Sequence, residues 1–167
     1  RITEELQSFS AKLAQGGRTL HGLGEIETGV SPREAVYQED KLTLYRYQPR
    51  VAQPHPVPLL IVYALVNRPY MMDLQEDRSM IRGLLDAGLD VYLIDWGYPD
   101  AADRALSLAD YIHRYIDHCV DTLRERCGQD AINLLGVCQG GTLSLCFSSL
   151  YPEKIRNLVT MVTPVDF

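Results

Sequence analysis

The most informative stretch of the chain reads Asn133-Leu134-Leu135-Gly136-Val137-Cys138-Gln139-Gly140-Gly141. An apolar strand runs into Gly-x-Cys-x-Gly and then into a helical pattern, which is typical of a nucleophile elbow with cysteine where serine is common. Small residues suit a sharp strand-to-helix turn, because larger side chains would collide there. The pattern therefore predicts a thiol, Cys138, at the tip of a turn that is formed by Gly136, Gly140 and Gly141.

Length and composition limit the classes of protein to which the chain can belong. Its 167 residues suit one domain, and its 46% hydrophobic and 23% charged residues are those of an ordinary globular protein. A net charge of −6 without a basic stretch argues against nucleic-acid binding. The longest apolar run, residues 57–66, is too short to span a membrane, and we find no signal-peptide pattern. We therefore expect a cytoplasmic protein without a transmembrane segment.

The remaining pattern alternates buried strands with helices. Strands are predicted at residues 41–47, 59–64, 89–95, 131–137 and 157–162, and helices at residues 3–15, 75–87, 107–127 and 139–150. This order predicts one α/β domain over residues 1–167, in which residues 1–30 form a helix and a connection. We expect a mostly parallel sheet with helices on both faces and with active groups at the carboxyl ends of the strands.

The cysteines and histidines show no metal-site spacing. Cys119, Cys127, Cys138 and Cys146 lack both zinc-type pairing and a dense disulfide pattern, so we expect reduced thiols. Cys138 could also be a small buried residue in a packed turn. No metal or cofactor is expected, since even His113 and His118 would point to different faces of a helix.

A cysteine elbow favours acyl transfer. The nucleophile attacks an acyl carbon, and two N–H groups stabilise the oxyanion. One donor should be the backbone N–H of Gln139, and the other should come from the loop at residues 65–70, where we expect Val66. Exchange of one thioester for another keeps the acyl group activated, which suits transfer to an alcohol rather than hydrolysis.

Four further residues at strand ends could face a substrate, namely Asn67, Arg68, Asp95 and Trp96. Arg68 could bind a phosphate or carboxylate, or it could be a surface arginine without such a role. Asp95 is expected to cap nearby backbone N–H groups rather than to contact substrate. No histidine follows Cys138, so the chain lacks a complete catalytic set.

Five blocks of the chain, at residues 60–70, 73–79, 92–100, 136–141 and 158–167, together resemble the catalytic subunit of class III polyhydroxyalkanoate synthases. Class IV synthases are close relatives. The resemblance covers the N-terminal portion of the family's usual length. It implies an α/β-hydrolase-like core that is incomplete at the C-terminus, without the cap and the last strands.

The resemblance also implies an activity and partners. The family polymerises (R)-3-hydroxyacyl groups from their coenzyme A thioesters into polyester, with coenzyme A as leaving group and Cys138 matching the nucleophile. Its general-base histidine and the partner aspartate lie downstream of residue 167. A second, PhaE-type subunit, a homodimer and a location at polyester granules are implied as well. A cysteine-dependent esterase of the same fold, or a fragment that is inactive without its C-terminal half, are the alternatives.

Overall fold

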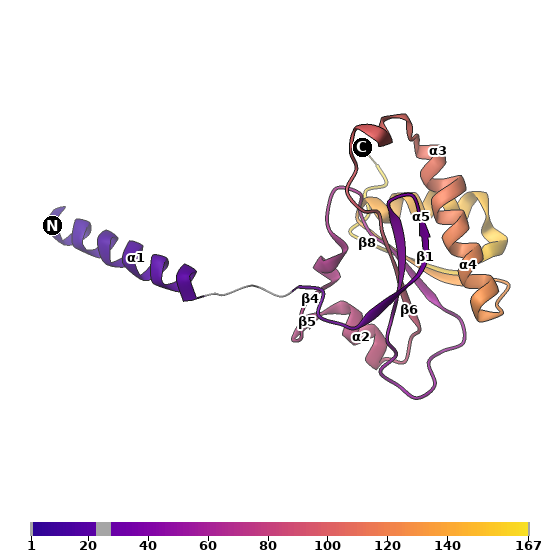
Figure 1. The fold of residues 1–167 in the computed structure, drawn as a ribbon, viewed down its shortest axis with the longest axis horizontal. Coiled ribbons are helices and arrows are strands. Elements are labelled where there is room, and N and C mark those ends of the chain that lie inside the picture. The colour runs from indigo at the N-terminus through magenta and orange to yellow at the C-terminus, as the bar shows by residue number, and fades with distance from the viewer. Residues whose placement is uncertain (1, 23–27, 167) are drawn as a thin grey trace.

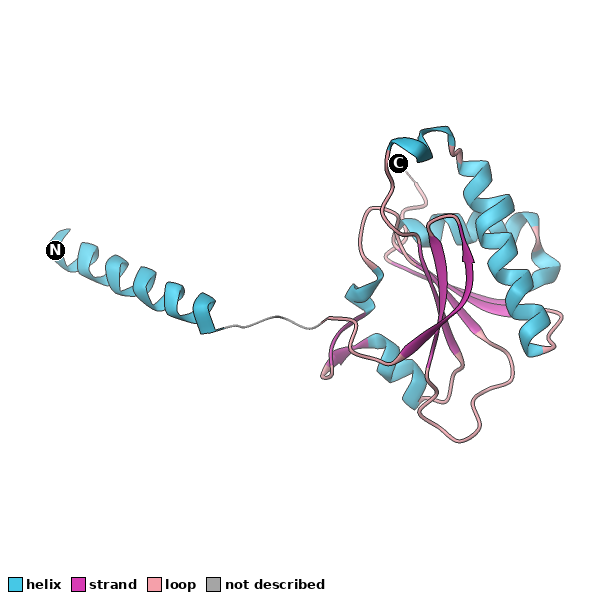
Figure 2. Ribbon diagram, in the orientation of Figure 1, coloured by secondary structure: helices cyan, strands magenta, loops and turns pink. Residues whose placement is uncertain are grey.

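A computed structural model describes residues 2–22 and 28–166 of the chain. A sheet lies between helices in residues 28–166 (Figure 2). It has six strands in the spatial order β1 (Arg33–Glu39), β2 (Leu42–Tyr47), β6 (Val91–Asp95), β3 (Leu59–Val62), β7 (Ile132–Val137) and β8 (Ile155–Met161). The strands β6, β3, β7 and β8 run parallel, whereas β1 and β2 pair antiparallel at one edge. The predicted mostly parallel sheet is confirmed.

Helices cover both faces of this sheet (Figure 1). They are α2 (Met80–Asp86) on one face, and α3 (Leu108–Asp110), the π-helical segment η3 (Tyr111–Ile116), α4 (Asp117–Cys127) and α5 (Gln139–Leu150) on the other. Successive residues of a strand point to opposite faces, so β3 places Ile61 in the cluster with Leu85 of α2, and Leu60 in the cluster with Val120 of α4. The central strands β3, β6 and β7 are mostly apolar because each of their faces packs against a helix, with Asn133 and Asp95 near strand ends as the polar exceptions.

The short elements connect the sheet to its helices. They are the 3-10 helices η1 (Pro69–Met72), η2 (Ala101–Ala105) and η4 (Pro152–Lys154), and the small hairpin of β4 (Asp73–Gln75) and β5 (Arg78–Ser79). The carboxylate of Asp73, with no exposed surface, accepts hydrogen bonds from the N–H and the hydroxyl of Ser31 and from the hydroxyl of Ser79. These bonds join the segment before β1 to the start of α2.

Two predictions about helices were wrong, and strand β1 was not predicted. The helix expected at residues 75–87 begins only at Met80, because the hairpin precedes it and the Ser79 hydroxyl accepts the first helical N–H, that of Arg82. Strand β1 was missed, since its exposed, charged residues lack an apolar rhythm. The first helix, α1 (Ile2–Gly22), continues past Gly16 and Gly17, which cost about 1 kcal/mol each relative to alanine.

Other boundaries agree with the sequence. The helix that starts at the Ser107–Asp110 capping box ends at Gly128, whose φ of +60° gives the expected left-handed cap. After its first residues in α3, the segment Tyr111–Ile116 is π-helical rather than α-helical, which the apolar spacing did not reveal. The connection expected within residues 1–30 falls partly on residues 23–27, which lie outside the described residues. The assignment of residues 1–167 to a single domain stays a prediction.

Candidate active site at the carboxyl end of the sheet

Cys138 occupies the tip of a strained turn between β7 and α5. Its φ of +55° and ψ of −127° lie in a region that side-chain-bearing residues rarely adopt, at a cost of about 1–3 kcal/mol. The Cys138 N–H donates to Met161 O at 2.9 Å, and its carbonyl accepts from Gly141 N–H at 2.9 Å. The thiol-bearing residue is exposed, so the alternative of a buried packing residue is wrong. The role of this turn as a nucleophile elbow stays a prediction.

The three glycines of the elbow have no room for a side chain. A Cβ on Gly136 would lie 2.5 Å from Gly141 Cα, one on Gly140 would collide with Val62 O, and one on Gly141 would collide with Thr163 Oγ1. Val62 ends β3, and Thr163 follows β8. The elbow therefore packs directly against the carboxyl ends of both neighbouring strands, as an α/β site at this edge requires.

Gln139 is the first residue of α5. A backbone N–H in the first turn of a helix has no intrahelical acceptor, and the helix dipole makes it a good donor to an anion. The Gln139 side chain reaches the opposite loop, where Oε1 accepts a hydrogen bond from Leu65 N–H at 3.1 Å. The next residue, Val66, is 86% exposed. The roles of Gln139 and Val66 as oxyanion donors stay predictions.

Arg68 and Asp95 hold two loops together at the same edge. Arg68 Nη1 donates to Gly97 O at 2.8 Å, Nη2 lies 3.3 Å from Asp95 Oδ1, and the guanidinium stacks 3.9 Å from the ring centre of Tyr98. Asp95 Oδ1 also accepts from Gly97 N–H at 3.1 Å, so its capping interpretation is confirmed. The guanidinium of Arg68 thus binds groups of the protein itself, and its contact with substrate stays a prediction.

Trp96 and Asn67 also make contacts within the protein. Trp96 Nε1 donates to Tyr63 O at 3.0 Å, and its ring meets that of Tyr111 edge to face at 5.4 Å. Asn67 is exposed, and its Oδ1 accepts from the N–H of Arg68 at 2.8 Å. Arg68, Asp95 and Trp96 thus connect loops at this edge, whereas Asn67 bonds only its neighbour Arg68. The contact of all four with substrate remains a prediction.

The other cysteines and the histidines lie in different surroundings. Cys119 is fully buried, and burial raises the pKa of its thiol, as burial also does for Cys127. His113 contacts the Tyr151 hydroxyl at 2.7 Å, and His118 contacts Glu39 at 2.8 Å. No hydrogen bond of the described residues joins a histidine to Cys138.

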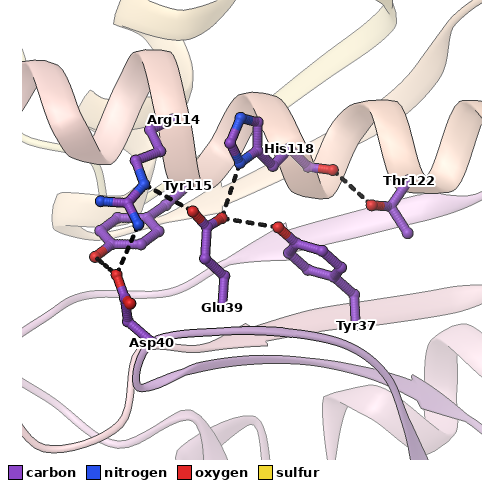
Figure 3. A network of polar contacts seen from close by, with 7 residues as sticks. All are labelled: Tyr37, Glu39, Asp40, Arg114, Tyr115, His118 and Thr122. Carbon is purple, nitrogen blue, oxygen red and sulfur yellow. Dashed lines mark hydrogen bonds and ion pairs between the residues drawn. The ribbon is translucent and has the colours of Figure 1, made fainter.

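Glu39 is the centre of a polar network that the sequence did not reveal (Figure 3). It accepts hydrogen bonds from Tyr37, from Arg114 at 2.7 Å and from His118. Burial alone would raise the pKa of Glu39, but the hydrogen bonds from His118, Tyr37 and Arg114 outweigh burial and lower the pKa below its ordinary value of 4.5. The network fastens the β1–β2 hairpin to η3 and α4. The one sequence signal of this network is the spacing of Arg114 and His118, two basic side chains four residues apart on a helix.

The described part of the chain holds neither a metal-ligand cluster nor a membrane-spanning helix. Within residues 2–22 and 28–166, no three His, Cys, Asp or Glu side chains are grouped so that they could hold a metal ion. Among the helices of that same part, none combines the length and the apolar character that crossing a bilayer demands.

Two family models match the chain. Residues 57–167 match the family described as alpha/beta hydrolase fold, and residues 5–84 match the family described as Poly-beta-hydroxybutyrate polymerase (PhaC) N-terminus. Among solved structures, the thioesterase domain from the curacin biosynthetic pathway aligns with a TM-score of 0.59 at 18% identity, over 81% of this chain and 46% of that chain. Epoxide hydrolase A from Mycobacterium thermoresistibile aligns with a TM-score of 0.54 at 15% identity, over 78% and 39%. These two structures bear on the fold alone.

Curated relatives are much more similar in sequence. The chain is 65% identical to the poly(3-hydroxyalkanoate) polymerase subunit PhaC of Allochromatium vinosum, over 100% of this chain and 48% of that protein. It is 59% identical to the subunit of the same name from Synechocystis, over 98% of this chain and 44% of that protein. The chain thus spans about half the length of the curated relatives that it matches.

Proposed function

Because the chain belongs to the alpha/beta hydrolase fold family and matches the N-terminal half of PhaC subunits, we propose that it forms the nucleophile half of a class III poly(3-hydroxyalkanoate) synthase. The substrate class is (R)-3-hydroxyacyl coenzyme A, and the product is a polyester. The observation that carries the proposal is the exposed cysteine in a strained elbow at the carboxyl end of a parallel sheet.

The first step forms a covalent acyl-enzyme. The Cys138 thiolate attacks the thioester carbonyl, the carbon–sulfur bond to coenzyme A breaks, and coenzyme A leaves as a thiolate that takes up a proton. The backbone N–H groups of Gln139 and Val66 stabilise the negative charge that develops on the carbonyl oxygen. One thioester replaces another, so the acyl group stays activated for the next step.

The second step lengthens the polymer. The 3-hydroxyl of another hydroxyacyl group attacks the Cys138 thioester, an ester bond forms, and the carbon–sulfur bond to Cys138 breaks. The hydroxyl proton passes to the general-base histidine, which the family places downstream of residue 167 with its aspartate partner. Activity therefore needs the C-terminal half as well, and coenzyme A is a leaving group rather than a cofactor.

The partners belong to the same proposal. We infer a second, PhaE-type subunit, a homodimer, and a cytoplasmic location at the surface of polyester granules. The relatives carry the word subunit in their names, which supports an assembly of more than one kind of chain. On α1, Leu6, Phe9 and Leu13 are each about 60% exposed, which supports contact with another molecule.

The substitution Cys138→Ala tests the proposal in the full-length synthase. We expect the variant to fold and to lose polymer formation from hydroxybutyryl coenzyme A, because no other thiol lies at the elbow. Polymer and free hydroxy acid are separated and quantified. Polymer from the variant would contradict the proposal, and free acid as the main product of the wild-type protein would favour a cysteine-dependent hydrolase of the same fold.

A further inference from the structure

The side chain of Gln139 links the two loops from which the oxyanion donors are expected. Its Oε1 accepts from Leu65 N–H at 3.1 Å, and these two residues are 74 positions apart in the chain. Leu65 directly precedes Val66. We propose that Gln139 is a positioning residue, whose side chain holds the Val66 N–H in place relative to the N–H of Gln139 itself. This inference rests on the proposed function.

In the described part of the chain, the other side-chain hydrogen bonds that join the loop carrying Val66 to different elements lie at its two ends. At its start, Tyr63 O accepts from the indole of Trp96 at 3.0 Å. At its end, the guanidinium of Arg68 donates to Gly97 O at 2.8 Å. Between these ends, the contact of Gln139 is the one side-chain hydrogen bond from another element among the described residues.

Burial does not fix the middle of this loop. Val66 is 86% exposed, and Asn67 is exposed beside it, so neither side chain is held in the core. The Leu65 side chain is half-buried and packs against the core, which holds one side of the loop but not the two exposed residues that follow. Among the described residues, the one side chain of another element that forms a hydrogen bond to the middle of this loop is that of Gln139, next to the Val66 N–H.

Small displacements matter at such a site. Donors act when they lie about 2.7–3.1 Å from the oxyanion, and loss of one donor lowers turnover by about 10²–10³-fold. A misplacement of about 1 Å can cost about 10²-fold. A donor that becomes loosely held should therefore cost about 10- to 100-fold in the acylation step, with little effect on binding of the remote parts of the substrate.

The test replaces Gln139 with methionine in the full-length synthase. Gln139→Met keeps the length of the side chain and the backbone N–H, and it removes the acceptor of the Leu65 hydrogen bond. Two reactions of Cys138 are compared, namely acylation by hydroxybutyryl coenzyme A and alkylation by iodoacetamide. Alkylation is a displacement at a saturated carbon, so it develops no oxyanion and does not use the donors.

In Gln139→Met, we expect the rate of Cys138 acylation by hydroxybutyryl coenzyme A to fall about 10- to 100-fold. The loss should appear in kcat, with KM changed less than about threefold. Alkylation should stay within about twofold of the wild-type rate. Gln38→Met is the matched control. It makes the same glutamine-to-methionine change at an exposed position of β1, far from the elbow in sequence. It should leave both rates unchanged.

The outcomes separate this inference from the proposed function. Acylation of Gln139→Met at the wild-type rate overturns the positioning role. A parallel fall of acylation and alkylation also overturns it, since that result shows general damage to the elbow. A wild-type protein that alkylates but does not acylate contradicts the proposed function, and the inference falls with it.

Discussion

At the scale of the residue, Cys138 combines backbone strain with exposure. Its positive φ is held by the hydrogen bond to Met161 O and by glycines that allow α5 to pack against β3 and β8. Strain of this kind persists where the surrounding structure over-determines it, and it is concentrated at functional sites. The turn places the thiol at the end of the sheet, and its backbone strain lowers the stability of the fold.

The strain at Cys138 predicts that a glycine there stabilises the fold. Cys138→Gly relieves about 1–3 kcal/mol of strain and loses about 0.5–1 kcal/mol through the greater freedom of glycine in the unfolded chain. The free energy of unfolding of the full-length protein should rise by about 1 kcal/mol, as measured by urea denaturation. Cys138→Ala is the control, because alanine keeps the strain and should leave the value nearly unchanged. A glycine variant less stable than the alanine variant would show that the turn is not strained.

At the scale of the element, the Glu39 network fastens the β1–β2 hairpin to η3 and α4 (Figure 3). Lys154 makes a second bridge between elements, from η4 to Asp117 and Asp121 of α4. The hairpin lies at the antiparallel edge of the sheet, where β1 has exposed residues and little core of its own. Side-chain hydrogen bonds therefore matter more for β1 than for the buried central strands.

Glu39→Gln should lower the free energy of unfolding by about 1–2 kcal/mol at pH 7, because the charged acceptor of three hydrogen bonds is lost. The pKa of Glu39 is lowered in the folded protein, so its carboxylate stabilises the fold above its ordinary value of 4.5. This contribution is lost as the pH falls through the lowered pKa. Urea denaturation across pH 3–7 checks the trend.

The control for this change is Glu34→Gln, since Glu34 is 63% exposed and pairs with Arg126 at 3.4 Å. Such an exposed ion pair contributes little to stability. Glu34→Gln should therefore lower the free energy of unfolding by less than about 0.5 kcal/mol at any pH from 3 to 7. A difference between Glu39→Gln and the wild-type protein that stays constant down to pH 3 would contradict the role of the Glu39 carboxylate.

Much of the fold was predictable because it depends on local patterns. The spacing of Gly136, Cys138 and Gly140 predicted the elbow, and continuous apolar runs predicted the buried strands. Strand β1 was not predictable, because its pairing with β2 rather than its own burial defines it. The contacts of Arg68 with Asp95 and of Gln139 with Leu65 join residues 27 and 74 positions apart, so only the strand order brings them together.

At the scale of the whole molecule, the sheet stops at β8 with apolar surface uncovered. Val159 is 53% exposed, and a groove of about 290 Å³ beside α2 is lined by apolar residues of β7 and β8, including Leu135 and Met161. A parallel strand with an open edge is a place where further chain or a partner can pair. The chain spans about half of its curated relatives, and the proposed mechanism likewise requires groups from the other half.

The central claim is that Cys138 forms an acyl thioester with the substrate. Its most direct test is the intact mass of the full-length synthase after brief exposure to one equivalent of hydroxybutyryl coenzyme A, followed by acid quenching and mapping of the modified peptide. We predict a mass increase of one hydroxybutyryl group, located on Cys138, removable by hydroxylamine and absent from Cys138→Ala. An adduct on another residue, or polymer formed without any adduct on Cys138, would contradict the account.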